Sequence, residues 1–236
     1  VVSVAPDGTD RVVHARIEGF PISIDWDLDG RLLIVEGAQR RVVRHEPNGV
    51  ELVADLSLLS GAPWNEIASD RSGRVYDNGI GFDMMAGEPS ASGQIALIDV
   101  DGSIRQVADD LAFPNGMAIT PDGSQLLVAE SHGGRITAFT ITPDGDLVDR
   151  APFAELPEGA PDGLAAVADG TLWYADVPNR HCRRVDSSGA VVETVDADRG
   201  CFSCAVSPDG TLFITANVWD ENTFNSRRGV LYRASP

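Results

Sequence analysis

Apolar residues along this chain gather in short β-branched and aromatic runs, and most runs follow a polar turn that ends in glycine. One series of turns opens "DLDGRLLIVE", "SDRSGRVYDN", "TPDGSQLLVAE", "VADGTLWYAD" and "SPDGTLFITA", and its glycines are Gly30, Gly73, Gly123, Gly170 and Gly210. A second series interleaves with the first, and its glycines are Gly8, Gly49, Gly102, Gly145 and Gly189. Asp-Gly and Asn-Gly pairs between β-rich runs are typical of hairpin turns, because they adopt positive φ at little cost. The pattern predicts repeated hairpins and no long helix.

The spacing of these turns predicts a β-propeller. Each series repeats every 40 to 53 residues, and two hairpins per repeat of this length are typical of a four-stranded antiparallel blade. The first-series turns predict blades that open near Phe20, Trp64, Phe113, Ala160 and Cys201. Residues 1–17 supply only a second hairpin, and the last repeat supplies three strands.

From this count we expect an all-β, six-bladed propeller that forms a single domain over residues 1–236, with residues 1–17 as the outer half of an incomplete first blade. The alternative is a five-bladed ring closed by the N-terminal segment. The chain begins in mid-pattern with "VVSVAPDG" and without Met, so we expect residues upstream of Val1, and a removed signal peptide is compatible with this start.

Composition narrows the range of partners. Hydrophobic residues make up 43% of the chain, and no apolar stretch approaches the ~20 residues of a membrane helix. The 36 acidic residues against 18 Lys plus Arg give a net charge of −18, which disfavours nucleic acid and anionic membranes and mildly favours cations. The three cysteines, an odd number, favour a reducing compartment, so the expected location is the cytoplasm.

One repeat position carries candidate chemistry. It lies eight residues before each first-series glycine and is occupied by Ile22, Asn65, Asn115, Asp162 and Phe202. Equivalent inner-strand positions of a propeller form a ring around the central channel, and three consecutive blades place side-chain oxygens there. Such oxygens are hard ligands that suit Ca²⁺ or Mg²⁺ and accept Mn²⁺, Fe²⁺ or Zn²⁺. Alternatively, Pro-Asn-Gly and Pro-Asp-Gly are turns in which Asn and Asp bond their own backbone.

Several segments resemble the gluconolactonase/regucalcin (senescence marker protein 30) family, and in particular its bacterial lactonase-like branch. They are "WNEIASDRSGRVYDNGIGFD", "VADDLAFPNG", "LAFPNGMAITPDGSQLLVAESHGGRITAFTI" and "PDGLAAVADGTLWYADV". The resemblance implies one divalent cation, held in that family by a Glu, an Asn and an Asp. By position, Asn115 matches the ligand Asn, and Asp162 matches the Asp that serves as ligand and general base. Asn65 matches the substrate-side Asn, which also touches the metal in some members.

Two departures from the family pattern bear on this site. The ligand Glu of the family lies in a Glu-Gly-Pro-x-Trp stretch that is missing here; "FPISIDW" resembles it but has Ile22 in place of the Glu. We expect the ligand Glu to belong to the upstream half-blade. The second departure is Glu66, which stands where the family usually has Asp. Its longer side chain could reach the channel or simply shift the floor of the pocket.

Further residues are candidates for the substrate pocket. Trp64 and Glu66 flank Asn65, and Phe82 and Asp83 lie on the longest insertion of the repeat, which is typical of a lid or pocket wall or, alternatively, of a plain surface loop. His132 could line the pocket mouth as an acid or base, or be an ordinary loop residue. Cys201 and Cys204 form a single CxxC on an inner strand, where we expect buried cysteines rather than a zinc site.

The sequence therefore predicts a metal-dependent hydrolase, with a lactonase that opens a sugar lactone or similar cyclic ester as the first interpretation. Asp162 and Asn65 are the expected catalytic residues, and Ca²⁺ is the expected cation, with Zn²⁺, Mn²⁺ or Fe²⁺ as alternatives. The expected partner is a small molecule, and the oligomeric state is open. The competing interpretations are a non-enzymatic binding propeller with a structural cation, and a phosphotriester hydrolase that uses the same residues.

Overall fold

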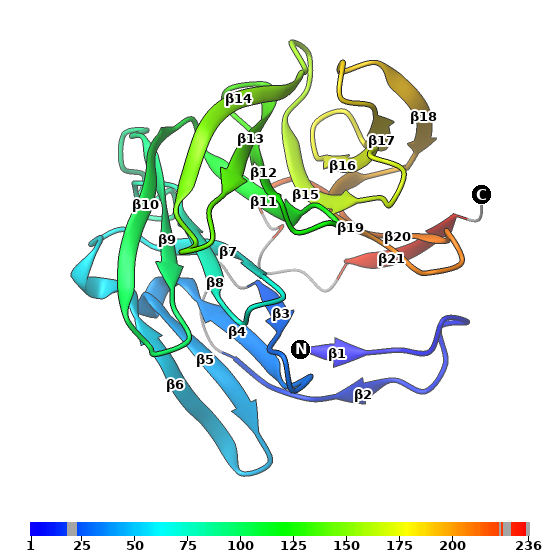
Figure 1. Cartoon of the computed structure of the whole chain (residues 1–236). Helices are drawn as coiled ribbons and strands as arrows, with labels where there is room; N and C mark the ends of the chain where they lie inside the picture. The colour runs from blue at the N-terminus through cyan, green and yellow to red at the C-terminus, as the bar shows by residue number, and fades with distance from the viewer. Residues whose placement is uncertain (18–22, 222, 224–227, 235–236) are drawn as a thin grey trace.

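The predicted all-β propeller is confirmed. In the computed structural model, which describes residues 1–17, 23–221, 223 and 228–234, antiparallel sheets are arranged around a common centre (Figure 1). Five of these sheets are blades, numbered here in chain order. Blades 1 to 4 have four strands and blade 5 has three among the residues described.

The strands of each blade follow one another in the sequence. Blades 1 and 2 contain β3 (Ile24–Trp26), β4 (Leu32–Glu36), β5 (Arg41–Glu46) and β6 (Gly49–Asp55), then β7 (Trp64–Ser69), β8 (Val75–Gly79), β9 (Gly93–Ile98) and β10 (Ile104–Leu111). Blades 3 and 4 contain β11 (Pro114–Ile119), β12 (Gln125–Glu130), β13 (Arg135–Ile141) and β14 (Leu147–Glu155), then β15 (Pro161–Ala166), β16 (Leu172–Asp176), β17 (His181–Val185) and β18 (Val191–Asp196). Blade 5 contains β19 (Gly200–Val206), β20 (Leu212–Asn217) and β21 (Val230–Ala234).

The expectation of a six-bladed ring is wrong, because the described chain forms five blades. Residues 1–17 form a two-stranded ribbon of β1 (Val2–Ser3) and β2 (Val12–Val13), which lies between blades 1 and 5 in Figure 1. The turn at Gly8 closes a hairpin as predicted, but each strand has two residues and all four side chains are exposed. Without a buried apolar face the ribbon lacks the packing that defines a blade.

The turn glycines predicted from the sequence all adopt the conformation that only glycine takes easily. Their φ angles lie between 74° and 145° in both series. A side chain at these positions would be strained, so glycine fixes where these hairpins close.

The core consists of four apolar clusters, and each of them joins two neighbouring blades. The cluster between blades 1 and 2 contains Leu33 and Trp64. The cluster between blades 4 and 5 contains the free thiols of Cys182, Cys201 and Cys204, so the expectation of buried cysteines is confirmed.

Helical structure in the described chain is confined to short turns, which include the 3₁₀ helices Gly37–Gln39 and Leu56–Leu58. No helix in this part of the chain is both long and apolar enough to span a membrane.

Candidate active site

The residues of the repeat position lie at β-bulges in the inner strands. The register between the first and second strands of blades 2 to 5 shifts at Trp64/Glu66, Pro114/Met117, Pro161/Leu164 and Cys201/Ser203. A bulge leaves an extra residue unpaired and redirects its side chain. Asn65, Asn115, Asp162 and Phe202 therefore hold equivalent positions, and all four line one central cavity. Ile22, the corresponding residue of blade 1, lies outside the described residues.

The glycines that follow Asn115 and Asp162 serve close packing rather than turns. Both segments are strands, and neither glycine has a positive φ. A Cβ on Gly116 would lie 2.3 Å from the backbone oxygen of Asp162, and a Cβ on Gly163 would lie 2.6 Å from the Cα of Ser203. The interpretation of Pro-Asn-Gly and Pro-Asp-Gly as turns is therefore wrong: glycine lets neighbouring inner strands approach each other at the site.

A buried acid at the end of the second strand anchors the segment that leads into each of these two inner strands. Glu130 accepts a hydrogen bond from the Ala112 N–H at 2.7 Å, and Asp176 accepts one from the Ala160 N–H at 3.1 Å. Burial raises the pKa of Glu130, but hydrogen bonds from Arg135, the Ala112 backbone and Thr137 outweigh it and bring the pKa to about 2. The acid is thus ionised at neutral pH and holds its partners strongly.

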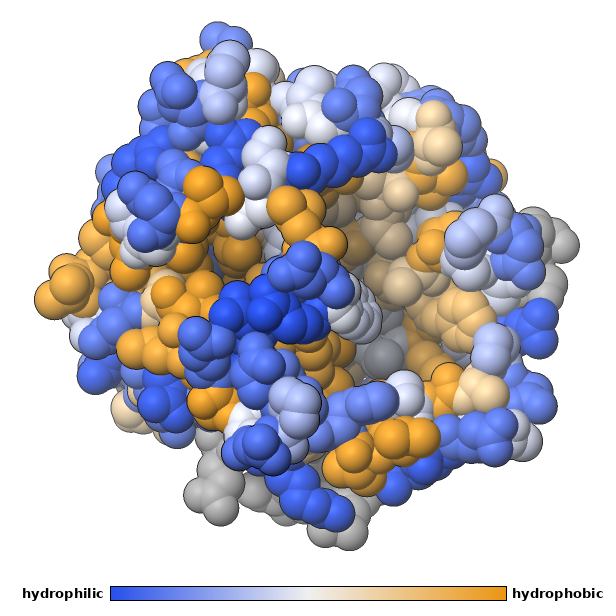
Figure 2. All heavy atoms as spheres, turned by 60° about the horizontal axis from the view of Figure 1, so that its bottom comes forward, coloured by the Kyte–Doolittle hydropathy of each residue, from blue (hydrophilic) through white to orange (hydrophobic). Residues whose placement is uncertain are grey.

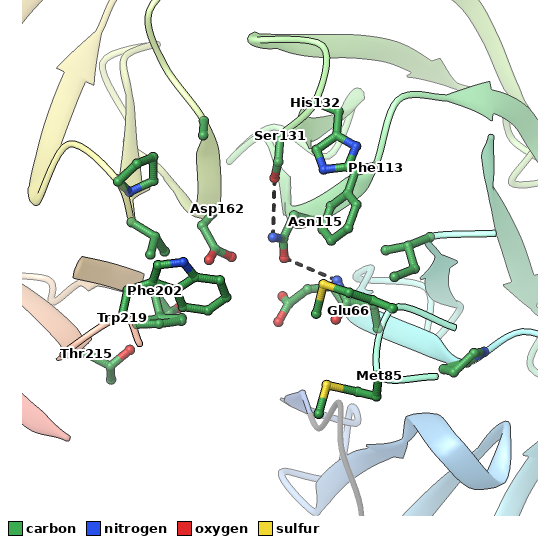
Figure 3. Close-up of a pocket in the computed structure, with 18 of the residues that line it drawn as sticks. Glu66, Met85, Phe113, Asn115, Ser131, His132, Asp162, Phe202, Thr215 and Trp219 are labelled. Carbon is green, nitrogen blue, oxygen red and sulfur yellow. Dashed lines mark hydrogen bonds between the residues drawn. The ribbon is translucent and has the colours of Figure 1, made fainter. Parts of the chain in front are cut away.

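Asn115 is held by hydrogen bonds from several directions. Its Oδ1 accepts from Asn65 Nδ2 at 3.2 Å, and its own Nδ2 donates to Ser131 Oγ at 3.3 Å (Figure 3). The Ser131 hydroxyl in turn donates to the Pro161 carbonyl at 2.7 Å, and Asn78 Nδ2 donates to the backbone carbonyl of Asn115 at 2.6 Å. This chain of bonds links blades 2, 3 and 4 and fixes the amide of Asn115.

The central cavity has a volume of about 540 Å³, and two carboxyl groups point into it. Figure 3 shows Glu66 and Asp162 directed toward the same space as Asn115. Burial raises the pKa of Asp162 well above its usual value, and the negative charges of Glu66 and Asp176 raise it further. Burial also raises the pKa of Glu66 to about 7, although the Ser23 hydroxyl lowers it. Both acids are therefore harder to ionise than free carboxyl groups, and a positive partner would favour their charged forms.

The donor set of the cavity fits a divalent cation. No group of three or more His, Cys, Asp or Glu side chains in the described part of the chain is arranged to hold a metal, so a ligand set here needs further oxygen donors, which the Asn115 amide can supply. Glu66, Asp162 and Asn115 would supply hard oxygen ligands of the kind that Ca²⁺ and Mg²⁺ take. A divalent cation between the two acids would also neutralise both buried charges.

The cavity includes some of the predicted pocket residues but not others. Glu66, Asp83 and His132 line it. Trp64 does not, because its fully buried ring belongs to the core between blades 1 and 2. Phe82 is not a lining residue either; its ring lies behind the lining residue Phe113, with the ring centroids 5.8 Å apart.

Other lining residues were not identified from the sequence. Ser131 stands next to the predicted His132, and Met84 and Met85 belong to the insertion that was expected to form a lid or wall. Phe202 was noted only as an apolar exception in the ring, and Trp219 follows β20 in an irregular segment. Their ring centroids are 5.7 Å apart. Only the insertion gave a signal in the sequence, through its length.

A β-propeller whose central cavity is lined by acids and amides is typical of propellers that bind or hydrolyse small molecules. The chain belongs to the SMP-30/Gluconolactonase/LRE-like family, whose model matches residues 1–218.

Individual curated relatives match only part of the chain, at modest sequence identity. L-arabinolactonase of Azospirillum brasilense is 30% identical over 132 residues, which are 54% of this chain and 44% of the relative. The chain spans about half the length of the curated relatives it matches.

Solved structures share the fold over more of the chain. A gluconolactonase from Xanthomonas campestris has a TM-score of 0.68 and 27% identity, covering 82% of this chain and 68% of that one. A structure described as a calcium-binding protein, regucalcin, from Agrobacterium tumefaciens has a TM-score of 0.78 and 20% identity, covering 98% of this chain and 81% of that one.

Proposed function

We propose that the protein is a lactonase-type hydrolase that depends on one divalent cation. The observation that carries the proposal is the convergence of Glu66, Asp162 and Asn115 in one central cavity of a chain that belongs to this family. Relatives named L-arabinolactonase and gluconolactonase support a cyclic ester as the substrate. Such a substrate is compatible with a cavity of about 540 Å³.

Some of the site residues would bind the cation, and others would contact the substrate or the attacking water. Glu66, Asp162 and Asn115 would hold the cation, which when bound would supply Lewis-acid polarisation of the ester carbonyl. Asp162 accepts the proton of the attacking water, and Asn65 donates a hydrogen bond to the substrate. Because a nearby positive charge lowers a carboxyl pKa, we expect Asp162 to be an effective base only in the loaded site.

Glu66 takes on a role here that the resemblance alone does not give it. It lines the same cavity as Asp162, and its negative charge raises the pKa of Asp162. We infer that Glu66 is the second carboxylate ligand, supplied from β7. Ca²⁺ is the first choice of cation because all the donors are oxygens, and Zn²⁺, Mn²⁺ or Fe²⁺ are the alternatives to test.

The test is to measure the metal content of the purified protein, strip it with a chelator, and titrate Ca²⁺, Zn²⁺, Mn²⁺ and Fe²⁺ during hydrolysis of several lactones and a chromogenic phosphotriester. The proposal expects one cation per chain and turnover of a lactone that returns with the metal. Metal binding without turnover would favour a non-enzymatic binding propeller. Turnover of the phosphotriester alone would favour the third interpretation, and a protein that neither binds metal nor turns over would contradict the proposal.

A further inference from the structure

The walls of the central cavity differ in chemistry from the acids and amides that converge within it. Large apolar side chains line these walls: Met84, Met85, Phe113, Phe202 and Trp219. Figure 2 shows the ring hollowed near its centre, with orange and tan hydrophobic atoms along much of the hollow. An apolar wall of this kind favours an apolar part of a ligand, because burial removes that part from water.

The apolar wall is built from four separate segments, and local contacts fix two of them. Asp83 Oδ1 accepts hydrogen bonds from the Met85 and Ala86 N–H groups at 2.9 and 3.0 Å, which holds the turn that carries both methionines. Phe113 adopts a left-handed backbone, with φ of 59°, and its ring lies 4.4 Å from that of His132 between centroids. Non-glycine residues rarely adopt this conformation, and they concentrate at ligand sites.

The described lining of the cavity has no lysine or arginine that could bind an anionic substrate. The sequence contains no lysine, so its 18 strongly basic side chains are all arginines. None of the described lining residues is an arginine, whereas three of them are acids: Glu66, Asp83 and Asp162. A divalent cation would neutralise Glu66 and Asp162, but the described lining residues include no lysine or arginine to pair with a phosphate or carboxylate on the substrate.

We propose that the natural substrate is a neutral cyclic ester that carries an alkyl or aryl group, rather than a phosphorylated or carboxylated sugar lactone. This inference rests on the proposed lactonase function and names its substrate class. The acids and amides of the cavity bind the ester, and the apolar wall packs against the alkyl or aryl substituent. Each methylene buried against the wall is expected to raise kcat/KM by about 4-fold until the cavity is full.

The test compares substrates on the metal-loaded protein. It uses γ-lactones with side chains of one to seven carbons, dihydrocoumarin as an aryl lactone, gluconolactone, and its 6-phosphate. We expect kcat/KM to rise with chain length, dihydrocoumarin to be hydrolysed, and the phosphorylated lactone to be slower than gluconolactone by at least about 100-fold. Hydrolysis of gluconolactone with no gain from apolar substituents would overturn the inference and leave the lactonase function standing. Failure of every lactone would contradict the function itself.

A pair of variants tests the role of charge directly. Met85→Arg places a cation at the cavity on a side chain that is 59% exposed, so the fold should tolerate it. Leu58→Arg is the control, because Leu58 is 88% exposed on a 3₁₀ helix and does not line the cavity. We expect Met85→Arg, and not Leu58→Arg, to raise the rate for the phosphorylated lactone relative to gluconolactone by about 10-fold or more. Equal preferences in the two variants would overturn the charge argument.

Discussion

Blades 3 and 5 have the same backbone plan at the central cavity and opposite chemistry. Both inner strands bulge where they line the cavity, and the first residue of each pairs with the last residue of the second strand. In blade 3 that last residue is Glu130, and Asn115 occupies the bulge. In blade 5 it is Asn217, whose side chain bonds the Thr223 carbonyl and the Val218 N–H instead. The bulge of blade 5 then carries Phe202.

Blade 4 follows blade 3, with Asp176 at the strand end and Asp162 at the bulge. Blade 2 differs from both. Its second strand, β8, ends at Gly79 and so offers no side chain, and Asn65 is held instead by a hydrogen bond to the side chain of Asn115. The comparison shows that one scaffold position supplies either a reactive polar group or a piece of apolar wall. Which of the two it supplies depends on a few side chains, while the backbone plan stays the same.

The largest expected effect comes from removing the carboxylate of blade 4. Asp162→Asn deletes a proposed ligand and the proposed base together, so we expect kcat to fall by at least about 100-fold. Metal binding, measured by calorimetry, should weaken in the same variant. Phe202→Leu is the control from the apolar blade, and it should leave metal affinity unchanged. Full metal-dependent activity in Asp162→Asn would remove the assigned role of this residue.

Glu130 tests whether the strand-end acid stabilises blade 3. Glu130→Gln breaks the ion pairs of the buried Glu130 carboxylate with the partly exposed Arg135 and Arg150, and we expect the free energy of unfolding to fall by about 2 kcal/mol. Glu51→Gln breaks an exposed pair with Arg44 and should cost at most about 1 kcal/mol. Urea denaturation of both variants measures the difference. Equal losses would show that the position of the acid at the strand end does not matter.

The same acid gives a pH dependence with a definite sign. The pKa of Glu130 is about 2 in the folded protein against an ordinary value of 4.5. Because the folded pKa is the lower one, the stabilisation is complete above pH 4.5 and is lost as the pH falls toward 2. The gap in unfolding free energy between the wild type and Glu130→Gln should therefore shrink from pH 6 to pH 3. A gap that stays constant over this range would contradict the ion-pair explanation.

The smallest expected effect concerns the hydroxyl that joins blades 3 and 4. Ser131→Ala removes the hydrogen bond to the Pro161 carbonyl and the acceptor for Asn115 Nδ2. We expect a loss of about 1 kcal/mol in unfolding free energy and a fall of less than about 10-fold in kcat/KM, because the metal ligands remain. A larger fall in rate with no loss of stability would show that Ser131 contacts the substrate itself.

The sequence predicted those parts of the molecule that depend on local chemistry. Turn glycines marked the hairpins between the first and second strands and between the third and fourth strands of the blades, since positive φ is a property of a single residue. Counting back from the first series located Asn65, Asn115 and Asp162. Counting turns could not give the number of blades, because a hairpin such as that at Gly8 is closed by its turn whether or not it buries an apolar face.

Two other features were beyond sequence reasoning. Trp64 and Glu66 are two residues apart and would share a face in a regular strand, but the bulge between them sends Trp64 to the core and Glu66 to the cavity. Trp219 joins the wall from an irregular segment that has no periodic pattern to identify it.

The three buried thiols of Cys182, Cys201 and Cys204 make the contact between blades 4 and 5 observable in solution. The hydrogen bond with Cys182 and burial both raise the pKa of the Cys201 thiol, so it has little thiolate with which to react while the blades are packed. A thiol reagent must therefore wait until this contact opens. The rate at which the reagent labels Cys201 under native conditions measures how often the contact between blades 4 and 5 opens. A ligand that bridges the blades across the central cavity would slow this labelling.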